Sequence, residues 1–378
     1  MLRLAILGAL ALPGCAGSSE GAPVDSGRAS LNDASVEEDG APTSTPPSTS
    51  PDGGADDASS GDTSASDPPD SASASPTDDG SKEGGSCAPA MTGMRGLTMQ
   101  MVMVGGLART YLMYLPPSLD PGTPAPLVFV FHGSTMTGQQ MHDITQYADL
   151  ADREGFAVVF PDGQGAPIYL APWNVENPGQ TVCGSDQLIN ATGDDFGFMD
   201  AMKATVASYQ CTDSQHIFAT GFSMGGYLSH HIGCYRDDVR AVAPHSGGTI
   251  ASLSACPVAR RPVIIFHGTQ DGTIAPGCDD PNSAPQTGFL ASATLWAQHN
   301  GCGATYTTVP ESGDGGGAGQ CYVYEGCPAD GQVELCTFTG MAHCWAGGST
   351  AGQGALSACP TYPSATELEW AFFKKYAW

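Results

Sequence analysis

From residue 97 to the C-terminus, short apolar runs alternate with longer segments that carry apolar residues at helical spacing. Continuous apolar runs of strand length are typical of strands buried on both faces of a parallel sheet. We expect such strands within 126–133, 156–163, 216–221, 239–247, 261–271, 321–326 and 333–340, after a hairpin over 97–104 and 109–116. Helices are expected over 139–154, 194–209, 286–299 and 364–378, and directly after Ser223. This alternation predicts an α/β fold, with a mostly parallel central sheet covered by helices on both faces.

Residues 16–86 show neither the apolar runs of strands nor the apolar spacing of helices. They consist largely of Ser, Thr, Pro, Gly, Ala and Asp, with 15 acidic residues, two basic ones and no aromatic residue. Such a segment buries too little apolar surface to offset its chain entropy, so we expect a disordered tether. The composition becomes that of a globular domain at residue 87, and we expect one domain over 87–378.

The first residues, MLRLAILGALALPGCAG, combine Arg3 with a short apolar run that is too short to span a bilayer as a helix. The run ends in Leu-Pro-Gly-Cys15, which resembles the lipobox of bacterial lipoproteins. That resemblance implies cleavage before Cys15 and lipid attachment to its thiol, so residues 1–15 form the predicted signal and anchor. Because Pro13 is unusual in a lipobox, ordinary secretory cleavage is the alternative.

Charge and cysteine content narrow the classes of function. The formal charge of the chain is −26, and no basic patch suits a phosphate backbone, so the sequence disfavours nucleic-acid binding. Twelve of the 13 cysteines stand at or after Cys87, and no Cys-x-x-Cys pair occurs. An even set of cysteines behind an export signal predicts up to six disulfides rather than zinc sites. The expected location is therefore extracellular or on the cell surface.

A Gly-x-Ser-x-Gly motif stands between the expected strand at 216–221 and the helix after it, in the sequence GFSMGG. In a strand–turn–helix context this motif presents a nucleophilic serine, here Ser223. A helix-capping serine is the simpler interpretation.

A serine nucleophile needs a base and an orienting carboxylate. Asp271 follows the strand within 261–271 and His343 follows the strand within 333–340, which gives the order Ser, Asp, His found in α/β hydrolases. Asp279 or Asp280 is the alternative acid, and His245 and His267 are the rival bases.

The oxyanion hole requires two backbone N–H donors. We expect one from Met224, directly after the nucleophile, and the other from Ser134, with Thr135 as the alternative. His132 is expected to shape this loop rather than to transfer protons.

The segments FHGS, PWN, DDFGFMDAM, GFSMGGYLSH, HGTQD and GMAHCWAGG occur in the order seen in the polyhydroxybutyrate depolymerase-like esterase family. This resemblance covers essentially all of 87–378 and includes the feruloyl and acetylxylan esterases of carbohydrate esterase family 1. It implies a disulfide-rich α/β-hydrolase fold with Ser223, Asp271 and His343 as the triad. The chain departs from the family pattern at Ala342, Ala346 and Ser134, which often are Gly, Pro and Cys. A backbone-donor role for Ser134 does not depend on its side chain.

Trp173 and Trp345 are expected near the mouth of the site, where an aromatic wall would suit a feruloyl ring or a sugar face. Packing in the core is the alternative for both rings. Asp194 and Asp195 are interpreted as capping and loop-ordering residues.

The sequence thus predicts an exported serine esterase that acts on feruloyl or acetyl esters of cell-wall polysaccharide, with no metal or organic cofactor and no protein partner. A short-chain polyhydroxyalkanoate depolymerase is the second hypothesis and a serine peptidase the third. A non-catalytic polysaccharide-binding lipoprotein is the hypothesis from another class.

Overall fold

The computed structural model describes residues 87–91, 93–164, 173–175, 193–249, 253–274, 285–352 and 357–377. The expected signal with Cys15, the tether over 16–86 and the alternative acids Asp279 and Asp280 lie outside these residues.

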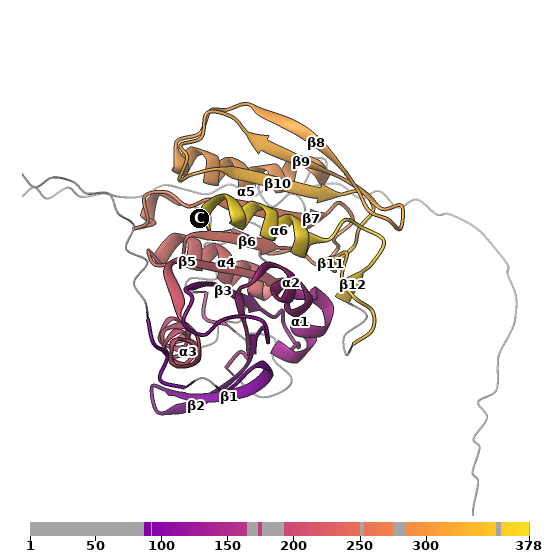
Figure 1. Ribbon diagram of the computed structural model, residues 1–378. Coiled ribbons are helices and arrows are strands. Elements are labelled where there is room, and N and C mark those ends of the chain that lie inside the picture. The colour runs from indigo at the N-terminus through magenta and orange to yellow at the C-terminus, as the bar shows by residue number, and fades with distance from the viewer. Residues whose placement is uncertain are drawn as a thin grey trace, which may run out of the picture. The chain divides into compact units, whose positions relative to one another are not determined.

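A ten-stranded sheet forms the centre of the described domain, in the order β1-β2-β4-β3-β5-β6-β7-β10-β9-β8 (Figure 1). The strands from β4 to β10 in this order run parallel, and antiparallel strands flank them at both ends. The strands are β1 (Gly96–Val104), β2 (Leu107–Leu115), β3 (Ala125–Phe131), β4 (Ala157–Pro161), β5 (Thr212–Phe222), β6 (Ala241–His245), β7 (Val263–Gly268), β8 (Tyr306–Ser312), β9 (Ala318–Tyr324) and β10 (Val333–Phe338). A separate parallel pair is formed by β11 (Trp345–Ala346) and β12 (Ala358–Cys359).

Helices cover both faces of the sheet, as the alternating pattern predicts. They are α1 (Gly138–Thr145), α2 (Tyr147–Glu154), α3 (Asp195–Tyr209), α4 (Met224–Tyr235), α5 (Pro285–Asn300) and α6 (Ala365–Phe373). The buried side chains of α3, α4 and α5 share one hydrophobic cluster, whereas those of α1, α2 and α6 belong to another. In Figure 1, α1, α2 and α6 lie in front of the sheet. The α/β-hydrolase fold expected from the sequence is thus confirmed.

Apart from the short pair of β11 and β12, which was not expected, two elements differ from the sequence-based expectation. The helix expected over 139–154 is split into α1 and α2 at Gln146, which adopts a left-handed conformation with φ 58°. The strand β8 was not expected at all. Its side chains are almost all exposed, because it pairs only with β9 at the edge of the sheet, and so it lacks the apolar run of a buried strand.

Five disulfides link the described cysteines: Cys87–Cys211, Cys234–Cys256, Cys302–Cys327, Cys321–Cys336 and Cys344–Cys359. Bridges of this number are typical of proteins from oxidising compartments. The other two cysteines after Cys87, Cys183 and Cys278, lie outside the described residues.

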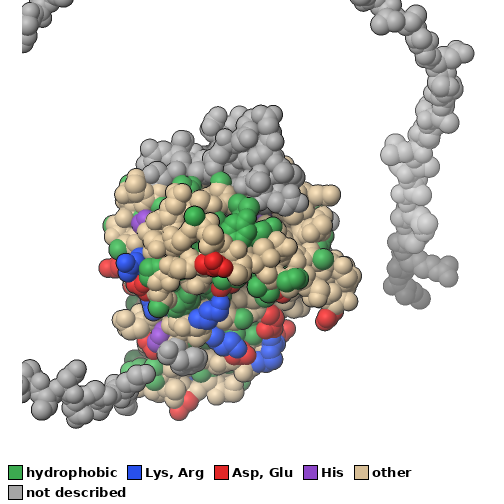
Figure 2. All heavy atoms as spheres, turned by 90° about the horizontal axis from the view of Figure 1, so that it is seen from above, with side chains coloured by type: hydrophobic (Ala, Val, Ile, Leu, Met, Phe, Trp, Pro, Cys, Tyr) green, Lys and Arg blue, Asp and Glu red, His purple; other side chains and the backbone are tan. Residues whose placement is uncertain are grey.

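The surface carries mixed charge. On the face in Figure 2, Lys and Arg side chains lie beside Asp and Glu side chains rather than in one basic patch. Within the described ranges, no helix is both long and apolar enough to cross a membrane.

Candidate active site

Ser223 occupies the sharp turn between β5 and α4. Its backbone has φ 56° and ψ −117°, a conformation that is costly for a residue with a side chain. The flanking glycines have no room for a Cβ atom: one on Gly221 would lie 2.5 Å from the Gly225 carbonyl oxygen, and one on Gly225 would lie 2.2 Å from the Phe131 carbonyl oxygen. The side chain of Ser223 makes no capping hydrogen bond to α4. Ser223 thus stands at the N-cap position of α4 without capping it through its side chain, and the motif forms the strained turn expected of a nucleophile.

Asp271 and His343 meet at the same edge of the sheet, although 72 residues separate them in the sequence. The Nδ1 atom of His343 lies 2.7 Å from Oδ2 of Asp271, and the Asp271 side chain is fully buried. The backbone N–H groups of Thr273 and Ile274 each donate to Oδ1 of Asp271 over 2.9 Å. With its Nδ1–H directed to this carboxylate, the neutral imidazole keeps its Nε2 lone pair as the basic site.

The environment of Asp271 keeps its carboxyl group ionised. Burial raises its pKa, but the hydrogen bond and charge of His343, together with the two backbone N–H groups, lower it more. The net effect is a pKa below the ordinary value of Asp. An ionised Asp271 can hold His343 in one tautomer and stabilise the imidazolium form.

The loop that carries His343 is fixed from several sides. The N–H of Gln270 donates to the Met341 carbonyl over 2.9 Å, and Gly340 N–H donates to Thr269 Oγ1 over 2.8 Å. The Phe222 ring packs 4.7 Å from the imidazole of His343 between ring centroids, which brings His343 beside the residue that precedes Ser223. The Cys344–Cys359 disulfide anchors the loop directly after the histidine.

The loop after β3 lies against Ser223. A Cβ atom added to Gly133 would lie 2.9 Å from Cβ of Ser223, so the two backbones are in close contact there. The Gly133 carbonyl accepts from Nδ1 of His132 over 2.7 Å and from the Met136 N–H over 3.3 Å. In a trans peptide the next N–H points the opposite way, so these bonds fix the direction of the Ser134 N–H.

His132 is held neutral within this loop. Its Nε2 atom accepts from the Gly163 N–H over 2.8 Å, which leaves the proton on Nδ1 for the bond to Gly133. Burial lowers the pKa of His132 to about 4. This environment supports the expected role of His132 in shaping the loop.

Trp173 supports the same loop from the core. Its indole N–H donates to the His132 carbonyl over 2.7 Å, and its ring packs edge-on against Phe131 with no exposed surface. Trp345 is also buried, stacks on His245 at 4.7 Å and donates to Thr366 Oγ1. The structure thus places both rings in the core rather than at a mouth, because each indole N–H needs an internal acceptor.

Sequence reasoning missed how the Trp173 segment is held. Arg109 on β2 forms a buried ion pair with Asp195 over 2.9 Å, and Asp195 Oδ2 accepts from the Asn174 N–H over 2.7 Å. Asp194 caps α3 by accepting from the Gly197 N–H, as the sequence predicts. The signal in the sequence for this ion pair was Arg109, a charged residue at the start of an otherwise apolar strand.

The rival histidines have structural positions. His245 accepts from the Ala346 N–H over 3.1 Å through Nε2, and its carbonyl accepts from the Ser223 N–H over 2.9 Å. His245 and His267 are both buried, and burial lowers the pKa of His267 to about 4. His245 thereby supports both the nucleophile turn and the loop after His343. Within the part of the chain that the structure describes, no group of three or more His, Cys, Asp or Glu residues is placed to hold a metal ion.

Known proteins match part of this chain. Residues 112–280 match the model of the dienelactone hydrolase family. The chain is 31% identical over 211 residues to feruloyl esterase C of Emericella nidulans, an alignment that covers 55% of this chain and 68% of that protein. It is 30% identical over 234 residues to feruloyl esterase D of Neurospora crassa, and this alignment covers 56% of this chain and 75% of that protein.

The chain belongs to the feruloyl esterase family. Membership of the feruloyl esterase family places it among the carboxylic ester hydrolases. Feruloyl esterase B of Piromyces equi is 30% identical over 245 residues, which make up 62% of this chain but only 42% of that longer relative. Among solved structures, an acetyl xylan esterase from Aspergillus awamori aligns with 73% of this chain and 99% of its own, at a TM-score of 0.48 and 17% identity.

Proposed function

We propose that this chain is an exported serine esterase that hydrolyses feruloyl or acetyl esters of plant cell-wall polysaccharide. The observation that carries the proposal is the Asp271–His343 pair, beside the strained turn of Ser223, in a chain whose relatives are named feruloyl esterases. A binding protein has no need for a strained serine turn or for a buried carboxylate that orients a histidine.

The proposed reaction proceeds through an acyl-enzyme. Ser223 Oγ attacks the ester carbonyl while Nε2 of His343 accepts its proton, and the same proton then passes to the leaving alcohol. The developing oxyanion is stabilised by the N–H groups of Met224, at the start of α4, and of Ser134. Water activated by His343 then releases the acid and restores Ser223.

The proposed oxyanion donors can be tested at Ser134, because its role depends on the backbone alone. Ser134→Ala keeps the N–H, so kcat should stay within about threefold. Ser134→Pro removes it and should lower kcat by about 10²–10³ with a smaller change in KM. Steady-state kinetics on a soluble ester would measure both, with circular dichroism to verify folding. Equal activity of the two folded variants would rule out this donor.

The acyl group can be tested with a panel of substrates. Purified protein would be assayed on methyl ferulate, acetylated xylan and polyhydroxybutyrate. We expect turnover of one or both of the first two. Turnover of the polyester alone would instead support the polyhydroxyalkanoate depolymerase hypothesis, and hydrolysis of none of the three would contradict the proposed function.

We also propose that the mature protein is held at a bacterial membrane by lipid on Cys15 and that residues 16–86 act as its tether. The Leu-Pro-Gly-Cys15 sequence and the acidic, low-complexity composition support this proposal. Membrane fractionation tests it: Cys15→Ser should move the protein from the membrane pellet to the soluble exported fraction. An unchanged distribution would contradict lipid attachment.

A further inference from the structure

A pocket lies at the edge of the sheet where the parallel strands begin, opposite the edge that carries Ser223. It is formed by residues 214–216, Asp237, Asp238, Arg240 and residues 257–261, and has a volume of about 780 Å³. We call it the arginine pocket. These residues stand at the start of β5, just before β6 and just before β7, whereas Ser223, Asp271 and His343 follow the ends of strands. A volume of this size falls within the range of about 300–1,000 Å³ that is typical of sites for small organic molecules.

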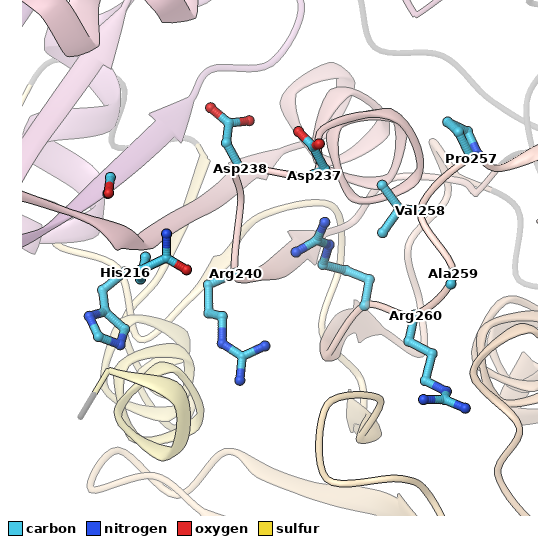
Figure 3. A pocket seen from close by; sticks show the side chains of 11 residues that line it. His216, Asp237, Asp238, Arg240, Pro257, Val258, Ala259 and Arg260 are labelled. Carbon is cyan, nitrogen blue, oxygen red and sulfur yellow. The ribbon is translucent and has the colours of Figure 1, made fainter. Parts of the chain in front are cut away.

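Positive charge is concentrated in this pocket. The domain from residue 87 carries only ten Lys and Arg residues against 24 acidic ones, yet Arg240, Arg260 and Arg261 line one pocket. In Figure 3, Arg240 and Arg260 point to one side of the pocket, and Asp237 and Asp238 lie on the other. The pocket therefore has one cationic side within a strongly acidic domain.

The charges of two of these arginines are not neutralised by a direct ion pair. Across the described ranges, neither Arg240 nor Arg261 has a carboxylate within salt-bridge distance, although Arg260 lies 3.6 Å from Asp330. Arg261 is buried and donates to the carbonyls of Gly233 and Arg236 at the end of α4. Burial lowers the pKa of Arg261 to about 10; the nearby charge of Arg240 adds to this effect, and the charges of Asp238 and Asp237 oppose it.

The acidic side of the pocket limits which class of anion can bind there. Asp238 is engaged by Lys203 and Arg236, which leaves Asp237 as an acceptor at the rim, with Gln215 and Ser214 also available. A phosphate group, with its higher charge, would be repelled by Asp237. A sugar acid has a planar carboxylate for the guanidinium groups and hydroxyl groups that can donate to Asp237 and Gln215.

The walls of the pocket are held in place without a ligand. The Cys234–Cys256 disulfide ties the segment before Pro257 to α4. The Val258 carbonyl accepts from Nε2 of His299 over 2.8 Å, and the Arg261 N–H donates to Asn300 Oδ1 over 3.0 Å. A preformed site loses little conformational entropy on binding.

We propose that the arginine pocket binds a uronate sugar whose carboxylate is held by Arg240, with Arg260, whose ion pair with Asp330 is exposed to solvent, adding positive charge on the same side of the pocket. The ligand is a uronate carried as a side group on an otherwise neutral polysaccharide, because a densely charged polymer would be repelled by the acidic domain. If the proposed function holds, this site gives the enzyme a second contact with its own polymeric substrate. Gln215 in the pocket and Ser223 stand eight positions apart along β5 and the turn after it, so the two sites lie about 26 Å apart. Binding at both would raise the effective concentration of ester.

Isothermal titration calorimetry on Ser223→Ala protein tests the proposal without turnover. The probes are a xylo-oligosaccharide with one uronate side group, the same oligosaccharide without it, and inorganic phosphate. We expect binding of the uronate form alone, weakened about tenfold or more by Arg240→Gln. Arg260→Gln serves as a second variant. Arg153→Gln, an exposed arginine on α2 that is paired with Glu367 and does not line the pocket, is the control for lost charge and should bind as tightly as the parent.

Equal binding of the neutral oligosaccharide, or unchanged affinity in folded Arg240→Gln and Arg260→Gln proteins, would overturn the proposal. Phosphate binding as tight as uronate binding would also overturn it, because the pocket would then be a general anion site. Turnover of methyl ferulate by the unmodified protein tests the proposed function separately, since that substrate carries no uronate. Failure of one proposal is thus distinguishable from failure of the other.

Discussion

Replacing Ser223 with alanine should lower kcat for ester hydrolysis by about 10⁶, because no other group at the site can form the acyl-enzyme. A fluorophosphonate probe should label the parent protein and leave Ser223→Ala unlabelled. Intact mass spectrometry measures the adduct, and steady-state hydrolysis of methyl ferulate measures the rate. Ser208→Ala, which removes a hydroxyl on α3 far from the site, should keep both labelling and rate. An adduct on folded Ser223→Ala protein would show that another residue is the nucleophile.

The same position should also reveal the conformational cost of presenting a nucleophile. At φ 56° and ψ −117° glycine is favoured over alanine. The Ser223→Gly protein should therefore be more stable than the Ser223→Ala protein, with a free energy of unfolding higher by about 1 kcal/mol. Urea denaturation of the two inactive variants measures this difference. If Ser223→Ala were the more stable variant, the turn would not be strained in solution.

Asp271→Asn should lower kcat by about 10⁴, a smaller loss than that expected for removal of the nucleophile. The amide has nearly the same shape, but its NH₂ group can donate to Nδ1 of His343 and so favour the tautomer whose Nε2 is protonated and cannot act as a base. The loss should appear in kcat with little change in KM, since Asp271 contacts His343 and backbone rather than substrate. Asp149→Asn, an exposed carboxylate in the first turn of α2, should retain activity.

Asp271 should also contribute to the pH dependence of stability. Its pKa is lower in the folded protein than its ordinary value, so its contribution is fully present above about pH 4 and disappears as pH falls through the lowered pKa. Asp271→Asn should therefore be less stable than the parent at pH 7, and the difference should shrink at pH 3. Urea denaturation at both pH values measures it. A difference that grows toward low pH would contradict the assigned direction.

Much of the fold could be predicted because the buried parallel strands have one repeated signature. The apolar runs that became β3, β4 and β7 are buried on both faces, and such runs permit few other structures. The tight turn at Ser223 could be predicted from the glycines around it, since no larger residue fits at those positions. For these strands and this turn, the local residue pattern and local steric limits were sufficient to predict the structure.

The rest depended on contacts between distant residues. The break at Gln146 could not be read from a continuous helical pattern, and β8 has an exposed sequence without strand-like alternation. The burial of Trp173 depends on the carbonyl of His132, 41 residues away, which accepts its N–H. Aromatic residues near a motif look the same in sequence whether they face a substrate or the core.

The Cys344–Cys359 bridge links the chemistry of this protein to the place where it is made. The base His343 immediately precedes Cys344, so oxidation of this pair fixes the position of the base. A chain retained in the reducing cytoplasm would have its nucleophile turn, which needs only glycines, but would lack this covalent anchor for its base. If the chain is exported as proposed, this anchor would form only once the chain has reached an oxidising compartment.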